Sequence, residues 1–288
     1  MSGPERFVDW AQHWQYWLVR GVFVLAVLAE VLRPERARLF SLAWRWTTNV
    51  GLHFINGWAL RIVAPYAVAS WLTATLGPPQ VSVLKPIEAW GGPWAVLVGA
   101  FVLLDLTTYF LHRLEHGVFV LWRVHSVHHA DADVDATTAV RHHPFEVLFT
   151  GASLPLFMLV LGIPTWAFPA YAGPQLILAL AQHANLRLPA RVEAALGLFV
   201  MTPGLHRTHH ASTPEYYNAN FGAVLSVWDR WFGTLAPPLP ERNAPSFGVP
   251  SFEAKQYARP HWALLMPFML RRRPAAPLPA GEHSVRSG

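Results

Sequence analysis

The chain contains no cysteine, which excludes disulfide bonds and thiolate metal sites. Charged residues are also scarce, at 14% of 288 residues, whereas hydrophobic residues make up 53%. The net charge of +5 comes from basic residues that flank apolar runs, and no long basic tract typical of nucleic-acid binding is present. No short basic region followed by a small-residue cleavage site opens the chain, so we expect no signal peptide. This composition favours a membrane protein that has no nucleic-acid partner.

Long apolar segments are predicted to cross the membrane, since a crossing needs about 20 residues. The segments are 14–32, 50–76, 94–111, 145–163 and 165–182. Arg20 and Glu30 leave an interfacial helix as the alternative for the first segment. The last two segments form a tight helical hairpin at Pro164. We therefore expect an all-α fold, an integral membrane bundle of about four or five transmembrane helices.

The basic residues predict how this bundle is oriented. Four arginines lie in the loop 33–48 and three more at 271–273, whereas the loop 77–93 has one Lys and one Glu. The excess of basic residues in cytoplasmic loops places 33–48, 112–144 and everything after 183 on the cytoplasmic side. His112 and His183, at the ends of the third and fifth segments, then face the same side.

Histidines gather in clusters with helical spacing, in which residues three or four apart lie close together. His112 and His116 form HxxxH, and two HxxHH clusters follow it. The first comprises His125, His128 and His129, and the second comprises His206, His209 and His210. Each cluster is expected to present its imidazoles on one helical face. His183 adds a ninth imidazole at the same side.

Eight or nine convergent imidazoles exceed the four ligands of a structural zinc site, so the pattern predicts two metal ions in a cytoplasmic, histidine-rich helical cap. Imidazole suits Zn, Cu, Fe and Ni, and the spacing leaves zinc and redox-active iron both open. His142 and His143 are further candidates, although His143-Pro144 is also suited to starting the next helix. Asp105 is expected either to orient an imidazole or to hydrogen-bond Thr or Tyr on another helix.

Several stretches resemble the fatty acid hydroxylase superfamily, which includes the sterol desaturases. They are DLTTYFLHRLEH from Asp105, WRVHSVHH, TTAVRHHPFE, QHAN at 182–185, TPGLHRTHH at 202–210 and NANFGAVLSVWDRWFGT at 218–234. The resemblance covers about 94–235, roughly half of the chain. It is specific because these boxes occur in order and at intervals similar to those of the family.

The resemblance implies a membrane, non-haem di-iron enzyme. Such an enzyme hydroxylates or desaturates a C–H bond of a lipid with O2 and electrons from a separate NAD(P)H-linked protein. The implied metal ligands are His112, His116, His125, His128, His129, His183, His206, His209 and His210. Asn185 or a water is a candidate for the tenth position, because some members have two histidines where this chain has only His183. Asn220 and Asp229 match the segment after the final box, where a supporting or structural role is expected.

We divide the chain into N-terminal helices at 1–93, a catalytic domain at 94–235 and a Pro-rich cytoplasmic tail at 236–288 with an interfacial segment at 261–273. Two alternatives to an oxygenase remain. A zinc-dependent membrane hydrolase would be expected to carry HExxH or an obvious catalytic Glu inside a box. HExxH is absent, and Glu115 precedes His116 in a different arrangement. A metal-handling membrane protein would be expected to spread its histidines across the bilayer.

Overall fold

The computed structural model describes residues 3–39, 41–63, 75, 82–239, 246–249 and 258–271. These residues are mainly helical, and the bridges Val200–Leu225 and Ala211–Phe247 are isolated. The longer helices are α1 (Gly3–Leu32), α2 (Leu42–Val63), α4 (Lys85–Gly117), α5 (Phe119–His129), α6 (Pro144–Leu161), α7 (Phe168–His183) and α13 (Pro260–Met269). The short helices are η1 (Ala136–Val140), η2 (Thr165–Ala167), α8 (Ala190–Leu196), α9 (Pro203–His209), α10 (Pro214–Tyr217) and α11 (Val227–Trp231).

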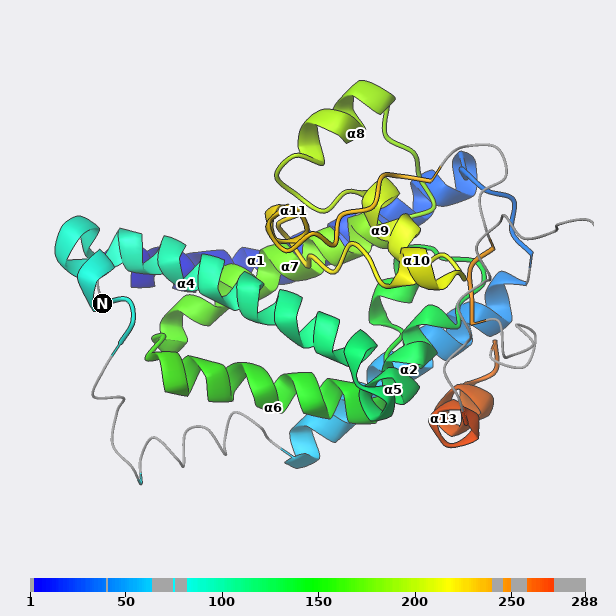
Figure 1. Cartoon of the computed structure of the whole chain (residues 1–288), viewed down its shortest axis with the longest axis horizontal. Coiled ribbons are helices and arrows are strands. Elements are labelled where there is room, and N and C mark those ends of the chain that lie inside the picture. Colours follow the sequence, from blue (N-terminus) through cyan, green and yellow to red (C-terminus); the bar gives the residue numbers. More distant parts are fainter. Residues whose placement is uncertain are drawn as a thin grey trace, which may run out of the picture.

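Figure 1 shows α1, α4, α6 and α7 running along the longest axis, with α5, α9, α10 and α13 gathered towards one end. Among the described residues, α1, α4 and α6 are long and apolar enough to cross a membrane. The all-α membrane bundle is therefore as predicted. The predicted crossing 165–182 corresponds to η2 and α7, and α7 has 16 residues. Residues 50–63 of the predicted crossing 50–76 lie in α2, and its residues 64–74 and 76 lie outside the described residues.

The core of the bundle lies where α1, α4, α6 and α7 meet. Leu97, Leu104, Met158 and Tyr171 are buried there. α1 packs closely along α7, and a Cβ atom at Gly173 of α7 would overlap the side-chain amide of Gln15. A larger residue at 173 would require the Gln15 side chain to move.

Helix ends follow local sequence signals. α4 bends at Gly92, which has a φ of 64° and precedes Pro93. From there the helix continues without a break to Gly117. α6 begins after His143-Pro144 and ends at Gly162, which adopts the left-handed conformation. The Thr202 hydroxyl caps α9 and Pro203 occupies its first turn, as the sequence predicts. The HxxxH motif therefore extends directly from a membrane span.

The C-terminal helix α13 packs against α5 and α2. Ala263 and Met266 are buried in that contact, while Leu265 and Phe268 stay exposed. α13 thus buries one side and exposes the other, and the interfacial location of the segment 261–273 stays a prediction. Residues 240–245, 250–257 and 272–288 of the predicted tail lie outside the described residues.

Candidate metal centre

Nine buried or nearly buried histidines meet in two groups at the end of the bundle. In the five-histidine group, one ring nitrogen of each member lies within 4.8 Å of those of the others, and the members are His112, His116, His125, His129 and His209. The same limit defines the four-histidine group, His128, His183, His206 and His210. These are the nine histidines predicted as ligands, and the structure brings all of them together. Their binding of metal stays a prediction.

Each HxxHH motif supplies both groups. In α5, His125 and His129 are one helical turn apart and enter the five-histidine group, whereas His128 enters the other. At α9 the division is reversed, with His206 and His210 in the four-histidine group and His209 in the other. The three rings of the α5 motif nevertheless lie next to one another, with centroids 4.9 to 5.5 Å apart, so one helical face supplies both groups.

Hydrogen bonds fix the protonation of two rings in the four-histidine group. His183 Nδ1 lies 2.7 Å from the Ala179 carbonyl oxygen, and His128 Nδ1 lies 3.2 Å from the Arg141 carbonyl oxygen. A carbonyl oxygen can only accept, so each Nδ1 carries the ring proton and each Nε2 carries a lone pair. The two Nε2 atoms nevertheless lie 3.1 Å apart.

The Nε2 atoms of His206 and His210 approach the same point. His183 Nε2 lies 2.9 Å from His206 Nε2 and 3.1 Å from His210 Nε2, and the last two atoms are 3.2 Å apart. Nitrogens bound at about 2.1 Å to one tetrahedral metal ion would lie about 3.4 Å apart. Four ring nitrogens at this spacing, of which those of His128 and His183 carry lone pairs, fit a shared metal ion better than a hydrogen-bonded cluster.

In the five-histidine group, two rings also contact a backbone carbonyl oxygen through Nδ1. His112 Nδ1 lies 2.9 Å from the Phe221 carbonyl oxygen, and His209 Nδ1 lies 2.7 Å from that of Ala219. Their Nε2 atoms are buried and have no hydrogen-bond partner among the described residues, nor has either ring nitrogen of His116. Leaving such atoms unsatisfied is costly, and metal coordination would satisfy them.

Burial also keeps these rings neutral. It lowers the pKa of His128, His129, His206, His209 and His210 well below the ordinary value of 6.5. The repulsion that neighbouring histidines would exert when charged lowers it further. Neutral imidazole is the form that binds metal.

Two buried carboxylates lie beside the five-histidine group. Glu146 Oε1 lies 2.8 Å from His125 Nδ1 and 2.7 Å from His142 Nδ1, and Glu115 Oε2 lies 3.6 Å from His125 Nδ1. Glu146 also caps the start of α6. Glu115 is buried beside His125. Its position three residues after His112 on α4 could have indicated this.

His142 and His143 lie outside both groups. His142 stacks on His128, while its Nδ1 and Nε2 contact Glu146 and the Ala139 carbonyl oxygen. His143 Nδ1 accepts the backbone N–H of Phe145, and its Nε2 lies 3.3 Å from the Leu264 carbonyl oxygen. The expectation that one of them is a ligand is therefore corrected, and His143 starts α6 instead.

Asp105 supports the site indirectly. Its carboxylate accepts hydrogen bonds from the backbone N–H groups of Val224 and Leu225, the Trp228 indole and the Tyr171 hydroxyl. The expectation that it orients an imidazole directly is wrong, and the alternative of an interhelical bond to Tyr holds. Asp105 thereby holds residues 224 and 225 against α4. These residues follow Phe221, whose carbonyl oxygen accepts a hydrogen bond from His112.

Asn220 and Asp229 have structural roles in the same loop. Asn220 adopts φ 57°, and its side chain bonds to the backbone of Leu205 and Ala236. Asp229 accepts the N–H groups of Phe221 and Gly222 at 2.8 Å each. Both therefore hold the turn that carries the hydrogen-bond acceptor of His112.

Asn185 is not available as a tenth ligand. Its side-chain oxygen accepts the Arg36 N–H, and its side-chain nitrogen donates to the Arg36 carbonyl, each at 3.0 Å. Its own N–H donates to Glu30 of α1. It fastens the connection after α1 to the end of α7.

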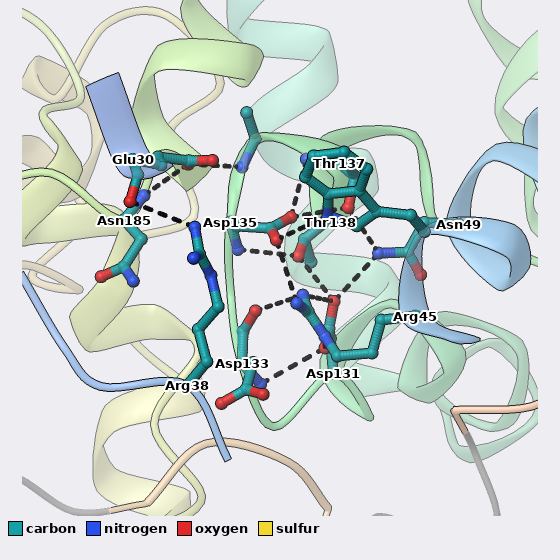
Figure 2. Close-up of polar contacts among 12 residues, drawn as sticks. Glu30, Arg38, Arg45, Asn49, Asp131, Asp133, Asp135, Thr137, Thr138 and Asn185 are labelled. Carbon is teal, nitrogen blue, oxygen red and sulfur yellow. Dashed lines mark hydrogen bonds and ion pairs between the residues drawn. The ribbon is translucent and has the colours of Figure 1, made fainter. Parts of the chain in front are cut away.

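A buried ionic network fastens the loop after the first HxxHH motif to α2 (Figure 2). Arg45 contacts both carboxylate oxygens of Asp131, at 2.8 and 2.9 Å, and Asp135 at 3.0 Å. Asn49 bonds to Asp131 and accepts from Arg141, the residue whose carbonyl contacts His128. Helices outside the histidine-box segment therefore help to hold the centre in place.

A cavity of about 500 Å³ opens beside both groups. Histidines of each group line it, including His112, His125, His128 and His183. Apolar side chains from the bundle line the remainder, among them Leu60, Leu111, Leu154, Phe168 and Leu176. Such a cavity suits a largely hydrocarbon ligand.

Residues 97–234 match the family model described as fatty acid hydroxylase. This segment belongs to the fatty acid hydroxylase family. It runs from within α4 to just beyond α11 and contains all nine histidines of the two groups. No solved structure gives a significant match.

Relatives of the fatty acid hydroxylase segment include lipid-modifying enzymes. The chain is 29% identical over 188 residues to the ornithine lipid hydroxylase of Rhizobium tropici, covering 64% of this chain and 55% of that protein. It is 31% identical over 149 residues to the alkylglycerol monooxygenase of Danio rerio, at 51% and 32% coverage. It is 34% identical over 112 residues to methylsterol monooxygenase 2-2 of Arabidopsis thaliana, at 39% and 38% coverage. The chain thus spans between about a third and just over half of these relatives' lengths.

Proposed function

We propose that the protein is a membrane-bound, non-haem di-iron oxygenase that hydroxylates or desaturates a C–H bond of a lipid. The names of its relatives, which include a lipid hydroxylase and two monooxygenases, support the reaction class. The three long apolar helices support a membrane location. The histidine groups are proposed to face the cytoplasm, in keeping with the arginines of 33–48.

One observation carries this proposal: two groups of convergent imidazoles line a mostly apolar cavity. Bound irons would supply, with O2, two electrons and two protons, the oxidising power to convert R–H to R–OH and water. Side chains cannot supply that power alone.

The protein's own residues would bind the metals and position the substrate. The nine histidines would hold the metals through the nitrogens that face one another. Glu146 and backbone carbonyls hold the Nδ1 atoms of five rings, which fixes the direction of the Nε2 lone pair in each of them. The five are His112, His125, His128, His183 and His209. The apolar residues of α4, α6 and α7 would hold a hydrocarbon chain and exclude water from the reacting carbon.

The proposed substrate is a lipid, with sterol-like, carotenoid and fatty acyl compounds all compatible with an apolar cavity of this size. Electrons are proposed to come from a separate NAD(P)H-linked protein. The donor and the lipid are the two partners that the reaction needs besides the membrane.

The test is to purify the full chain in lipid nanodiscs without added metal and to measure iron and zinc per chain. The same preparation is then given a membrane lipid extract, a reductant and ¹⁸O2. We expect about two irons per chain and a lipid product that carries ¹⁸O, or that has lost two hydrogens. Stoichiometric zinc without an O2-dependent lipid product would overturn the proposal, and it would favour a zinc hydrolase or a metal-binding protein.

A further inference from the structure

An exposed apolar patch lies outside the metal centre and the cavity. It is made by Val192, Leu196, Leu198, Phe199, Trp231 and Phe232, and is called here the α8–α11 patch. Phe199 is 65% exposed and Trp231 is 75% exposed. α8 buries none of its residues, and Figure 1 shows it standing out from the body of the molecule. A contiguous patch of this kind marks a surface that another phase or molecule covers.

The two halves of the patch are held side by side although about 30 residues separate them in the sequence. Val200 pairs with Leu225 in an isolated bridge, and the Ser226 N–H donates to the Phe199 carbonyl at 3.0 Å. The Ser226 hydroxyl donates to the Gly197 carbonyl at 2.7 Å, and Arg230 donates to the same carbonyl. The exposed side chains therefore belong to one rigid surface.

This surface continues the outer face of a membrane span. Phe232 packs against Phe110 and Tyr109 of α4, with ring centroids 5.1 and 5.3 Å apart. Phe110 is 45% exposed and lies near the end of the apolar run of α4. Since α4 spans the membrane, the α11 end of the patch lies at the depth of Phe110, where lipid covers the helix.

The charges around the patch agree with the same boundary. Arg187, Arg191 and Arg230 flank it, and Arg187 and Arg230 also line a cavity of about 810 Å³ next to α8. Two acids lie nearby: Glu35 Oε1 is 3.9 Å from Arg187 Nε, and Glu193 contacts the Thr202 hydroxyl. Tryptophan and arginine side by side are typical of the layer where lipid headgroups meet the acyl chains.

We infer that the α8–α11 patch is inserted into the headgroup–acyl boundary of the leaflet in which α4 ends. The occupant of this surface is the lipid bilayer. The inner side of α11 faces the metal centre, since Asp229 holds the turn at Phe221 whose carbonyl accepts from His112. The short helix α11 thus contacts lipid on its outer side. On its inner side, Asp229 holds the turn whose carbonyl accepts from the candidate ligand His112. The inference does not depend on the proposed chemistry.

The absence of cysteine makes a direct test possible, because every introduced cysteine is the sole labelling site. Phe199→Cys and Leu196→Cys, each carrying a nitroxide spin label, are reconstituted as full chains in phosphatidylcholine vesicles. Collision rates are measured with O2, which concentrates in lipid, and with a water-soluble nickel chelate. Val98→Cys on the exposed face of α4 is the lipid reference, and Glu215→Cys on exposed α10 is the water reference.

We expect the ratio of O2 to nickel collisions at 199 and 196 to exceed that at 215 several-fold and to approach that at 98. A ratio equal to that at 215 would overturn the inference, because it would put the patch in water. Exclusion of both probes would also overturn it, since a protein partner or a second copy would then cover the patch. Unchanged circular dichroism shows that each labelled chain is folded.

A second arm tests the flanking arginines. The label at 199 is measured in vesicles with added phosphatidylglycerol, in the parent chain and with Arg191→Gln. We expect the label to lie deeper in vesicles that contain phosphatidylglycerol. We expect Arg191→Gln to reduce this difference. Equal depth in both kinds of vesicle would overturn the role given to the arginines.

Discussion

His142 stacks on His128 with ring centroids 4.5 Å apart and ring planes 8° apart, while His142 Nδ1 contacts Glu146 Oε1 at 2.7 Å. The same carboxylate oxygen lies 2.8 Å from His125 Nδ1. Glu146 therefore touches the five-histidine group directly and the four-histidine group through one stacked ring. It is the buried anion through which the orientation of both groups is linked.

Replacing Glu146 with Gln should weaken metal binding. A neutral amide accepts from imidazole more weakly than a carboxylate, and its N–H2 group opposes either the ring protons or the His143 N–H. Loss of such a supporting partner lowers metal affinity or activity by about 10–100-fold. Metal per chain during dialysis against a chelator series checks this. Glu88→Gln, at an exposed position in the first turn of α4, is the matched control. An unchanged affinity in E146Q would show that the contact does not orient the ligands.

Replacing His183 with Ala should empty one metal position. His183 Nε2 lies within 3.1 Å of the Nε2 atoms of His128, His206 and His210, so its loss removes the nitrogen that all three approach. Metal per chain should fall from about two to about one, because three imidazoles hold a metal ion less tightly than four. His261→Ala, an exposed histidine on α13, should keep both. Two ions retained in H183A would rule out the four-histidine group as a separate site.

Removing metal should destabilise the folded chain. Lone pairs about 3 Å apart repel once no cation lies between them, and a ligand present at 100 times its dissociation constant contributes about 2.7 kcal/mol. Thermal unfolding in detergent should therefore shift to lower temperature after chelation. Adding ferrous iron should restore the transition, and adding magnesium, which prefers oxygen ligands, should not. Equal melting temperatures with and without metal would contradict this.

Arg45→Ala should destabilise the protein without touching a histidine. It leaves the buried Asp131 and Asp135 without their cation, and breaking a buried pair in this way costs about 3–5 kcal/mol. The melting temperature should fall by on the order of 10 °C. Arg61→Ala, an exposed arginine of the same helix, should have little effect. If R45A and R61A have the same melting temperature, the network in Figure 2 does not stabilise the protein.

The features that the sequence predicted well are those encoded within a few residues. The apolar runs became α1, α4 and α6, and the spacing of HxxxH and HxxHH put the histidines on helices. His183 was found because the hairpin of 145–182 returns the chain to the same face. Periodicity alone could not show that each HxxHH motif would divide between two groups, because that depends on how α5 and α9 pack.

The supporting residues were harder to predict, since their partners are distant in the sequence. Asp105 binds a loop more than 100 residues away, and Asn185 binds Arg36. Arg45 was noted only as a basic residue near the membrane, although it is 2% exposed and pairs with two aspartates. A buried charge reveals its role only when its counter-charge is known, and no local pattern supplies that.

The division of the HxxHH motifs has a consequence for how the protein is made. Both groups draw on α5 and on the segment around α9, so neither can be complete before the ribosome has passed residue 210. By then α6 and α7 have already been synthesised. Both groups can therefore be completed only after the hairpin has been made, and a chain that ends before α9 would carry six of the nine histidines and neither complete group.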